Sequence, residues 1–594
     1  MSSLLSINNL SIGFQTETGI APGVRDISLQ VQRGEIVALV GESGSGKSIT
    51  SLAILQLLPT PPTRYMSGEI LFTNSNGSRI DLLKQKPQQM QQIRGREIAM
   101  IFQEPMTSLN PVLTCGYQVS EAIRTHKKMS AGQARQEVID LFSKVKLPDP
   151  AGIFSRYPHQ LSGGQKQRVM IAMAMSGHPE LLICDEPTTA LDVTVQKTIL
   201  QLIKELQQTE NMGVIFITHD LGVVAEIADR ALVLYKGRIV EQGLVTDLFR
   251  HPKHPYTKGL LNCRPVLHPK GERLPVVSDF MEVDDKGEMY EKLPATGSPD
   301  QLITDKIAAT TDQIVLMPPG HPPAAPANKS VLIRVENCSI WFPATKNFLG
   351  KTLTYAKAVD DLSFEIFKGE TLGLVGESGC GKTTLGRALL RLIPLTSGRI
   401  LYEGRDLAGY TATALKQLRS HIQIIFQDPY SSLNPRLTIG SAIAEALQVH
   451  HIAATSRERK ERVMELLEKV SLKTEHFNRY PHEFSGGQRQ RIVIARALAL
   501  NPSFIVCDES VSALDVSVQA QVLNLLNDLK KEFGFTVVFI SHDLSVIRYI
   551  SDRMLVMNKG RIEEMGESEA VYNHPQTAYT GRLISAIPSA KISG

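Results

Sequence analysis

Short apolar runs alternate with segments of helical spacing along the chain. EIVALV precedes a glycine-rich loop, and ITSLAILQLL after that loop has its apolar residues at helical spacing. Two further apolar runs, ELLIC and VIFIT, end just before Asp185 and just before His219. Strands that are apolar on both faces, with helices between them, indicate a parallel α/β sheet. Polar residues at the carboxyl ends of such strands are expected where the sheet binds a ligand.

The chain carries the same set of motifs twice, in the same order. The first copies are GESGSGKS at 41–48, IFQEP at 101–105, LSGGQ at 161–165, CDEP at 184–187 and THD at 218–220. The second copies are GESGCGKT at 376–383, IFQDP at 425–429, FSGGQ at 484–488, CDES at 507–510 and SHD at 541–543. Two long copies are too few for a solenoid, so the sequence predicts a tandem pair of α/β domains.

The repeat predicts a first domain at 1–263, a linker at 264–329 and a second domain at 330–594. The linker loses apolar periodicity and ends in PPGHPPAAPANK, a composition typical of interdomain segments. Its first half could also pack as a small appendage. The first copy is longer than the second before IFQEP, and the polar run NSNGSRIDLLKQKPQQMQQ, which begins at Asn74, is predicted to be a surface insertion.

Composition narrows the function classes. The chain of 594 residues is 42% hydrophobic and 21% charged, so it can bury large cores and is not a disordered or fibrous protein. Its net charge of +4 is too small to indicate a nucleic-acid surface. Six cysteines without any C-x-x-C pair argue against a zinc module and favour reduced thiols in cytoplasm. The start lacks the pattern of a signal peptide, and no run reaches the roughly 18 apolar residues of a spanning helix.

Both glycine-rich loops fit the pattern G-x-x-x-x-G-K-[ST] between a strand and a helix, which is typical of phosphate binding. The glycines let backbone N–H groups converge on an anion, and the following helix adds its positive end. Lys47 and Lys382 are predicted to reach the β- and γ-phosphates, and Ser48 and Thr383 to ligate Mg²⁺. The residues predicted to bind ATP here are Gly41, Ser43, Gly44, Ser45, Gly46, Lys47, Ser48 and Ile49, and Gly376, Ser378, Gly379, Cys380, Gly381, Lys382, Thr383 and Thr384.

Each copy also has an acidic pair at a strand end. One carboxylate, Asp185 or Asp508, can hold Mg²⁺, while its neighbour, Glu186 or Glu509, accepts a proton from the attacking water. An isolated acidic pair is usually a solvated turn, but these pairs follow phosphate loops. The histidines of the matched THD and SHD motifs, His219 and His542, are predicted to contact the γ-phosphate.

LSGGQ separates this chain from other phosphate-loop proteins, because kinases and GTPases have no use for it. Its serine can cap a helix, and its glycines expose backbone donors to a phosphate. With the other motifs in this order, the sequence resembles the ATP-binding-cassette ATPases over nearly all of both halves. The resemblance implies tandem nucleotide-binding domains, each with a mainly parallel sheet and a helical subdomain that carries the signature.

The resemblance also implies two composite ATP sites in a head-to-tail arrangement. Lys47 would share one ATP with the signature of the second half, and Lys382 would share the other with the signature of the first. The signature residues concerned are Ser162, Gly163, Gly164 and Gln165, and Ser485, Gly486, Gly487 and Gln488. Gln103 and Gln427 match the Q-loop, which senses Mg²⁺ and the γ-phosphate and abuts a transmembrane partner. Asp192 and Asp515 match the D-loop, and Phe14 and Phe342, or neighbouring Trp341, resemble the aromatic that stacks on adenine.

Within that family, the SLNP segments and HPYTKGLL at 254–261 look like the peptide and nickel importer subgroup. This likeness implies the ATP-hydrolysing subunit of a bacterial importer for di- or oligopeptides or glutathione. It would sit on the cytoplasmic face of the inner membrane with two permeases, a periplasmic binding protein and one chain per complex. Only Cys263 stands where some relatives carry an iron–sulfur insertion, so no cluster is predicted. The alternative is a twin-cassette factor that acts on ribosomes or DNA. The near-neutral charge and the Pro-containing linker argue against this alternative.

Two positions depart from the family pattern. Ser510 replaces the proline that usually follows the catalytic Glu, and Phe484 replaces the leading Leu of the second signature. Neither change removes a phosphate-binding, metal-binding or proton-transfer group, so both sites are predicted to hydrolyse ATP.

Overall fold

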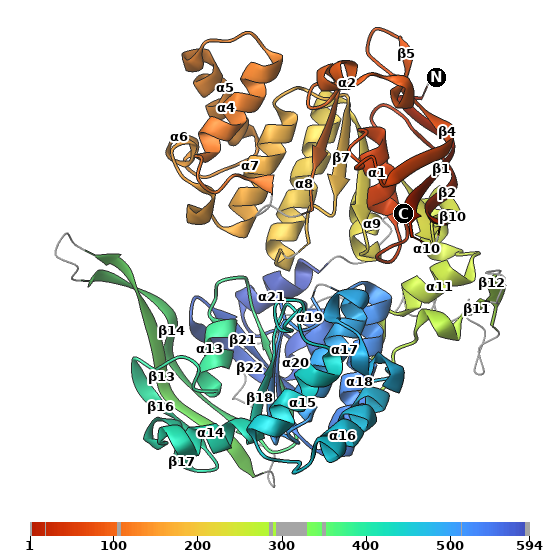
Figure 1. Cartoon of the computed structure of the whole chain (residues 1–594). Helices are drawn as coiled ribbons and strands as arrows, with labels where there is room; N and C mark the ends of the chain where they lie inside the picture. The colour runs from red at the N-terminus through yellow and green to blue at the C-terminus, as the bar shows by residue number, and fades with distance from the viewer. Residues whose placement is uncertain are drawn as a thin grey trace.

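A computed structural model describes residues 3–17, 19–103, 108–189, 191–283, 289–292, 330–346, 352–512 and 514–587. Two lobes of α/β structure lie one above the other (Figure 1). Each lobe contains a six-stranded sheet, a four-stranded antiparallel sheet and a helical part, and the strand order is the same in both. The predicted tandem α/β fold is therefore confirmed.

The six-stranded sheets form the centres of the lobes. In the first lobe the order is β10 (Arg238–Leu244), β9 (Arg230–Tyr235), β3 (Ile36–Val40), β8 (Gly213–Thr218), β7 (Leu181–Asp185) and β6 (Ile98–Ile101). In the second it is β22 (Arg561–Glu567), β21 (Arg553–Asn558), β15 (Thr371–Val375), β20 (Thr536–Ile540), β19 (Phe504–Asp508) and β18 (Ile422–Ile425). Only the edge strands β10 and β22 are antiparallel to their neighbours. Every residue of β3, β7, β15 and β19 is buried, as the uninterrupted apolar runs predict.

The antiparallel sheets flank the phosphate loops. The first consists of β2 (Gly19–Val31), β1 (Leu5–Thr16), β4 (Thr63–Thr73) and β5 (Arg79–Asp81). The second consists of β14 (Thr352–Phe367), β13 (Val331–Lys346), β16 (Ser397–Tyr402) and β17 (Arg405–Asp406). The β13–β14 hairpin is longer than its counterpart and projects from the second lobe at the left of Figure 1.

The helices cover the sheets and build a separate helical part in each lobe. In the first lobe they are α1 (Lys47–Ile54), α2 (Pro87–Ile93), α4 (Cys115–His126), α5 (Ala131–Lys144), α6 (Pro150–Phe154), α7 (Gly163–Met175), α8 (Val193–Glu210), α9 (Leu221–Ile227), α10 (Val245–Arg250) and α11 (Pro255–Asn262). In the second they are α13 (Lys382–Leu389), α14 (Ala412–His421), α15 (Ile439–Val449), α16 (Ser456–Lys469), α17 (Gly486–Leu498), α18 (Val516–Phe533), α19 (Leu544–Ile550), α20 (Ser568–Asn573) and α21 (Ala578–Ser585). The signature helices α7 and α17 belong to the helical parts.

The polar run that begins at Asn74 is a surface insertion only at its start, where residues 75–79 are exposed and the turn between β4 and β5 is longer than that between β16 and β17. For the rest of the run the prediction was wrong. The run forms β5, a 3₁₀ turn at Leu82–Lys84 and most of α2, and the second lobe has the counterparts β17, Leu407–Gly409 and α14. Leu82 and Met90 are fully buried. Their short elements anchor the antiparallel sheet, although polar residues surround both apolar side chains in the sequence.

The residues after α11 cross from the first lobe to the second. We call 264–283 the strap. Within it, the Leu274 backbone N–H donates to Asn524 Oδ1 over 3.0 Å, and Asn524 Nδ2 donates to the Leu274 carbonyl over 2.8 Å. The Tyr549 hydroxyl donates to the Glu272 carbonyl over 2.8 Å. The start of the predicted linker thus packs against the second lobe, whereas residues 293–329 lie outside the described part.

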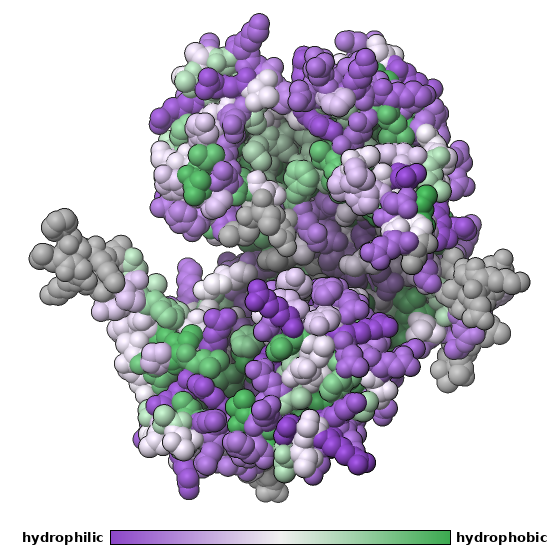
Figure 2. All heavy atoms as spheres, in the orientation of Figure 1, coloured by the Kyte–Doolittle hydropathy of each residue, from purple (hydrophilic) through white to green (hydrophobic). Residues whose placement is uncertain are grey.

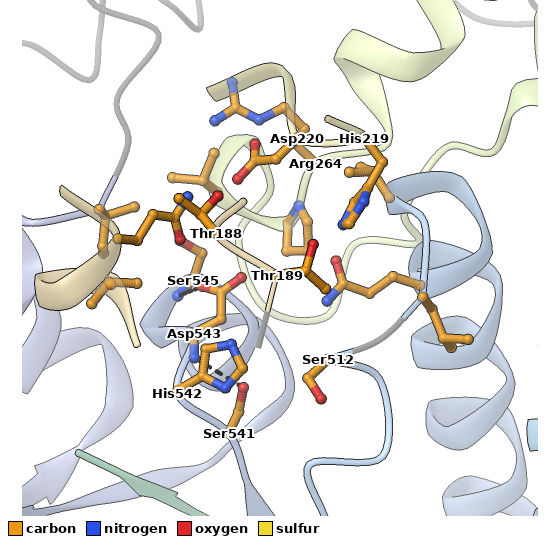
Figure 3. A pocket seen from close by; sticks show the side chains of 18 of the residues that line it. Thr188, Thr189, His219, Asp220, Arg264, Ser512, Ser541, His542, Asp543 and Ser545 are labelled. Carbon is orange, nitrogen blue, oxygen red and sulfur yellow. Dashed lines mark hydrogen bonds between the residues drawn. The ribbon is translucent and has the colours of Figure 1, made fainter. Parts of the chain in front are cut away.

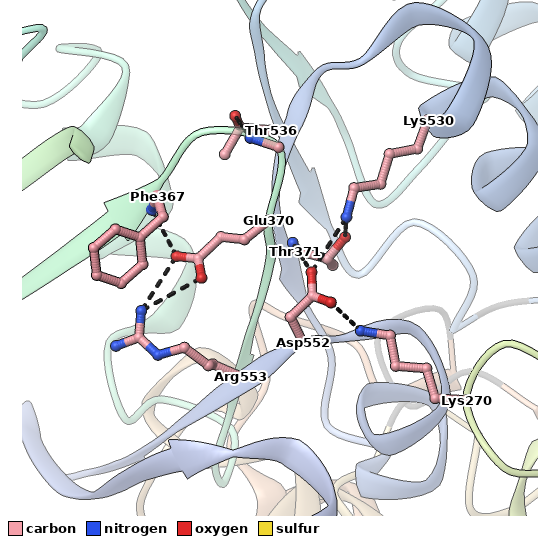
Figure 4. A network of polar contacts seen from close by, with 9 residues as sticks. Lys270, Phe367, Glu370, Thr371, Lys530, Thr536, Asp552 and Arg553 are labelled. Atoms are coloured by element: carbon pink, nitrogen blue, oxygen red, sulfur yellow. Dashed lines mark hydrogen bonds and ion pairs between the residues drawn. The ribbon is translucent and has the colours of Figure 1, made fainter. Parts of the chain in front are cut away.

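A polar network holds the strap against the second sheet (Figure 4). Lys270 pairs with Asp552, which also contacts Lys530 and accepts the Thr371 backbone N–H over 2.7 Å. Burial alone would raise the pKa of Asp552, but the Lys270 ammonium, the Thr371 amide and the Lys530 charge bring it below its usual value. Beside it, Arg553 pairs with the buried Glu370. The network fixes the strap to the edge at which β15 and β21 begin.

On the face seen in Figure 2, hydrophilic residues predominate on both lobes, with smaller hydrophobic patches between them. Among the described residues, no helix is long and apolar enough to cross a membrane. The lobes are related head to tail: in Figure 1 the helical part lies at the left of the first lobe and at the right of the second. This arrangement sets the phosphate loop of each lobe toward the other lobe.

Candidate functional site

The first phosphate loop, residues 41–48, connects β3 to α1. Gly41 has φ 152°, and a Cβ there would lie 2.2 Å from the Leu234 carbonyl oxygen, so the position accepts only glycine. Gly46 is the left-handed N-cap of α1. The buried Lys47 Nζ donates to the carbonyls of Gly41 over 2.6 Å and of Glu42 over 2.9 Å. Burial lowers the pKa of Lys47, opposed by the surrounding carboxylates.

The second loop, 376–383, repeats this geometry. Lys382 Nζ donates to the Gly376 carbonyl over 2.7 Å and to the Glu377 carbonyl over 2.9 Å. Gly376 again has φ 152°, and Gly381 is the N-cap of α13. The two loops therefore present the same backbone shape and the same buried ammonium group.

A hydroxyl and a carboxylate meet at the foot of each loop. Ser48 Oγ donates to Asp185 Oδ1 over 3.2 Å, and Thr383 Oγ1 donates to Asp508 Oδ1 over 2.9 Å. Burial, with the neighbouring Glu186 carboxylate, raises the pKa of Asp185 to about 6 against the hydrogen bond from Ser48. Burial also raises the pKa of Asp508. Hard oxygen ligands of this kind, few in number and next to a phosphate site, fit Mg²⁺.

The second carboxylate of the first acidic pair receives several donors. Glu186 Oε2 lies 3.0 Å from Gln103 Nε2, 3.0 Å from Thr189 Oγ1 and 3.3 Å from His219 Nδ1. Burial would raise the pKa of Glu186, but the hydrogen bond and charge of His219, the Thr189 hydroxyl and the Lys47 ammonium lower it to about 2. Burial would lower the pKa of His219, and Glu186 raises it above its usual value. The structure thus brings together three residues that the sequence selected and adds Thr189, which it did not.

The second lobe has a similar but not identical cluster. Glu509 Oε2 lies 2.8 Å from Gln427 Nε2 and 3.7 Å from His542 Nδ1. Ser512 donates to the Glu509 backbone carbonyl over 2.9 Å instead of to its carboxylate. Ser510, which replaces proline, is buried. The second carboxylate therefore lacks the hydroxyl donor that Thr189 provides in the first lobe.

Glu186 and Glu509, the predicted proton acceptors, have a backbone conformation that residues with a side chain rarely adopt. Glu186 has φ 47° and Glu509 has φ 48°. The left-handed region costs about 1–2 kcal/mol for a residue with a Cβ. The Glu186 N–H donates to the Ile217 carbonyl over 3.0 Å, and the Glu509 N–H donates to the Ile540 carbonyl over 3.0 Å. These bonds hold each strained residue at the end of its strand, so that its side chain turns toward the phosphate loop.

The signature motifs begin helices α7 and α17, as predicted. Ser162 caps α7 through the Gln165 backbone N–H over 3.3 Å, and Ser485 caps α17 through the Gln488 N–H over 3.4 Å. A Cβ on Gly164 would lie 2.6 Å from Val195, so this glycine also permits close packing on α8. Gly487 is packed against Val518 in the same way. Phe484 is buried like Leu161, so the changed leading residue keeps its place.

Hydrogen bonds connect each phosphate loop with the opposite lobe. The Ser43 N–H donates to Asp515 Oδ2 over 2.9 Å, and the Ser378 N–H donates to Asp192 Oδ2 over 3.4 Å. Glu377 Oε1 accepts a hydrogen bond from Thr194 Oγ1 over 2.8 Å. The serine at the corresponding position of the second lobe, Ser517, bonds the Glu42 carboxylate. The loops therefore face the D-loop residues of the other lobe, while sharing of ATP with the opposite signature stays a prediction.

The aromatic residues are equivalent between the lobes. Phe14 lies opposite Ala21 in the β1–β2 pair, and Phe342 lies opposite Ala356 in the β13–β14 pair. Trp341 instead contacts Tyr355, with a ring separation of 6.4 Å, and Lys357 Nζ, 4.8 Å from its ring centroid. Of the two alternatives, Phe342 is the counterpart of Phe14. Stacking on adenine stays a prediction.

A polar cavity of about 140 Å³ lies between the lobes (Figure 3). Its lining includes the histidines of both lobes, His219 and His542, and the aspartates that follow them. Those aspartates, Asp220 and Asp543, cap α9 and α19. The strap contributes Arg264. The two histidine loops therefore share one chamber, and the cavity belongs to the site.

Comparison with known proteins agrees with this geometry. The family model described as ABC transporter matches residues 24–189 and 359–512. The chain belongs to the ABC transporter family. It is an ATPase of that family with two ATP-binding cassettes. A second model, described as the C-terminal region of oligopeptide/dipeptide transporters, matches residues 240–283, which span α10, α11 and the strap.

Similar curated relatives are named glutathione import ATP-binding protein GsiA. The protein of Salmonella typhimurium is 48% identical over 592 residues, which are 99% of this chain and 90% of the relative. That of Pectobacterium atrosepticum is 46% identical over 588 residues, with the same coverage. That of Escherichia coli K12 is 47% identical over 596 residues, 100% of this chain and 90% of the relative. Nothing in these relatives supports the alternative of a factor acting on ribosomes or DNA.

Proposed function

We propose that this chain energises a bacterial importer for peptides, of the di- or oligopeptide or glutathione type, by hydrolysing ATP at two composite sites. The likeness to the named import proteins and to the oligopeptide/dipeptide transporter region supports the substrate class. The observation that carries the proposal is the repeated cluster in which a phosphate loop, a hydroxyl–carboxylate pair and a glutamate–histidine pair meet, facing the opposite lobe.

In the proposed mechanism each buried lysine exchanges its loop carbonyls for the β- and γ-phosphates of ATP. Ser48 and Asp185 would hold Mg²⁺ in the first site, and Thr383 and Asp508 in the second, where the ion offsets phosphate charge. Gln103 and Gln427 each donate a hydrogen bond to the proposed base of their own lobe, Glu186 or Glu509, which suits a sensor of the bound state.

Glu186 and Glu509 are the proposed bases that take a proton from the attacking water. In the present geometry the histidine donates to the glutamate, which keeps the carboxylate charged and its pKa low. Contact of His219 or His542 with a γ-phosphate would draw that charge away and raise the basicity of the glutamate. The signature serine and glycines of the opposite lobe, Ser485–Gly487 or Ser162–Gly164, would close the phosphate site.

The proposed location is the cytoplasmic face of the inner membrane, with two permeases and a periplasmic binding protein. A groove of about 350 Å³ beside the Q-loop, lined by Met100, Phe102, Met170 and Met173, offers a surface for a permease in the first lobe. Phe102 is 42% exposed, and its counterpart Phe426 is 39% exposed. We also propose the division into cassettes at 1–263 and 330–594, with one chain supplying both.

The test replaces both proposed bases. The Glu186→Gln and Glu509→Gln double variant keeps shape and Mg²⁺ ligands but removes the proton acceptor, so phosphate release should fall by about 10²–10⁴-fold while ATP still binds. The measurement is steady-state phosphate release in membranes that contain the permeases, with nucleotide binding as the control. Phosphate release by the double variant at the wild-type rate would refute the proposal.

A further inference from the structure

We call α11 of the first lobe and α21 of the second the tail helices. Each tail helix places a buried tyrosine behind the phosphate loop of its own lobe. On α11, Tyr256 is fully buried, and its hydroxyl accepts a hydrogen bond from the Glu42 backbone N–H over 3.1 Å. On α21, Tyr579 is 6% exposed, and its hydroxyl accepts from the Glu377 N–H over 3.3 Å and lies 3.4 Å from the Met557 carbonyl. The same contact is therefore made twice, by residues more than 200 positions away from the loops they touch.

The loops need this partner because of how they leave their strands. Gly41 packs directly on the Leu234 carbonyl, and Gly376 packs on the Met557 carbonyl. The next residue, Glu42 or Glu377, has its carbonyl bonded to the lysine ammonium, while its N–H points to the tyrosine. A partly buried N–H without an acceptor is unfavourable. The tyrosine hydroxyl supplies the acceptor that the loop itself does not have.

The same glutamates reach across to the other lobe. The Glu42 carboxylate accepts a hydrogen bond from Ser517 at the first turn of α18, and Glu377 accepts one from Thr194 at the first turn of α8. Burial and the adjacent Glu42 carboxylate raise the pKa of the Tyr256 phenol, so the group that accepts the Glu42 N–H is a neutral hydroxyl. One residue of each loop is therefore held from behind by its own tail helix and from the front by the opposite lobe.

We propose that Tyr256 and Tyr579 are positioning residues that keep the phosphate loops in the shape that receives ATP. Glu42 and Glu377 then transmit to that shape the contact with the opposite lobe. The inference rests on the proposed function of the site as an ATP-hydrolysing centre. It assigns a task to the tail helix of each cassette, which contributes no residue to the chemistry.

Removal of the hydroxyl alone tests this role. Tyr256→Phe and Tyr579→Phe keep the ring and its packing, including the contact of Tyr256 with Tyr235 at a centroid separation of 4.5 Å. Without the hydroxyl, the phosphate loop spends part of its time in conformations that do not bind ATP. The apparent affinity for ATP falls in proportion to the fraction of loops in the binding conformation. Once phosphates fill the loop they order it, so chemistry is unaffected. We expect the KM for ATP to rise by about 5- to 30-fold with kcat unchanged, the effect of a single modest bond.

The experiment measures ATP KM and kcat of the full chain for both Phe variants and their combination. Tyr235→Phe is the matched control, because the Tyr235 ring contacts that of Tyr256 but it is the Tyr256 hydroxyl that bonds the loop. A role in folding alone would lower kcat through loss of active protein and leave KM unchanged. An unchanged KM in the Tyr256→Phe, Tyr579→Phe double variant overturns the proposal.

Nucleotide binding separates this inference from the proposed function. In the Glu186→Gln, Glu509→Gln background, the Phe variants should weaken equilibrium binding of a fluorescent ATP analogue by the same factor. If the wild-type chain hydrolyses ATP and the Gln variants do not, the proposed function stands whatever the Phe variants do. If the wild-type chain fails to hydrolyse ATP, the proposed function fails. The positioning role of Tyr256 and Tyr579 is then tested by binding of the ATP analogue alone.

A double-mutant cycle tests transmission across the lobes. Tyr256→Phe and Ser517→Ala act on the same residue, Glu42, so their effects on KM should be non-additive. Tyr579→Phe combined with Ser517→Ala is the control pair, because the two changes lie at different loops. Additive effects in the first pair overturn the transmission through Glu42.

Discussion

Asn524→Ala should release the strap from the second lobe. Asn524 is 4% exposed, and its amide bonds both backbone groups of Leu274 over 3.0 and 2.8 Å. Alanine leaves a buried N–H and a buried carbonyl without partners, each at a cost of about 1–3 kcal/mol. Even the lower figure for both, about 2 kcal/mol, shifts the docking equilibrium of the strap about 30-fold.

Hydrogen–deuterium exchange of the full chain measures that shift. The informative amides are those of Asp279 and Phe280, which bond within the strap to Val276 and Val277 and do not touch Asn524. Their exchange should accelerate by about 30-fold, because they are protected only while the strap keeps its docked shape. The Leu274 amide is excluded from the comparison, since the substitution removes its own acceptor.

Asp528→Ala is the control for this prediction. Asp528 pairs with Arg273 over 2.9 Å, but the two side chains are 53% and 73% exposed. An exposed ion pair contributes about 0–1 kcal/mol, so the strap amides should accelerate by roughly fivefold at most. Equal acceleration by both variants, or none by Asn524→Ala, would show that the Leu274 contact does not hold the strap.

Two further predictions concern the glutamate clusters. Thr189→Val removes a hydrogen-bond donor from the Glu186 carboxylate, so in a Glu509→Gln background phosphate release should fall by roughly tenfold. Ser512→Ala in a Glu186→Gln background should lower phosphate release less, because Ser512 bonds the Glu509 backbone carbonyl and not its carboxylate. Equal losses in the two variants would contradict this difference between the lobes. The pair of Glu186 and His219 should also give a pH-dependent stability. The lowered pKa of Glu186 makes its contribution present above about 4.5 and lost as pH falls toward 2, whereas the raised pKa of His219 makes its contribution present below about 6.5 and lost as pH rises. The stability difference between wild type and Glu186→Gln, measured by denaturant unfolding, should therefore be largest between these values, and a pH-independent difference would refute the pairing.

Much of the fold and of the site follows from the sequence for a simple reason. The apolar runs are fully buried strands, and parallel strands bring their carboxyl ends to one edge, so Ser48, Asp185 and His219 could be expected to meet before their distances were known. Two copies of every motif made chance matches implausible. The helix caps at Ser162 and Ser485 are local and were predicted from the residues alone.

What the sequence did not reveal depends on contacts between distant segments. The left-handed backbone of Glu186 is imposed by neighbouring strands, and nothing in its residue type announces it. Tyr256 reads as an ordinary buried aromatic until α11 is placed behind the phosphate loop. Leu82 and Met90 were hidden within a polar run, because elements of three and seven residues are too short to show a period. The docking of the strap on Asn524 has no local pattern at all.

The strap also changes how the two cassettes find each other. Separate cassettes meet at a rate set by their concentration, and dilution drives them apart. Here both lobes belong to one chain, and the strap of the first also remains bonded to Asn524, Tyr549 and Asp552 of the second. Each lobe is then held at a high effective concentration near its partner, so that joining them becomes an intramolecular step. Assembly of the paired sites should consequently be indifferent to dilution.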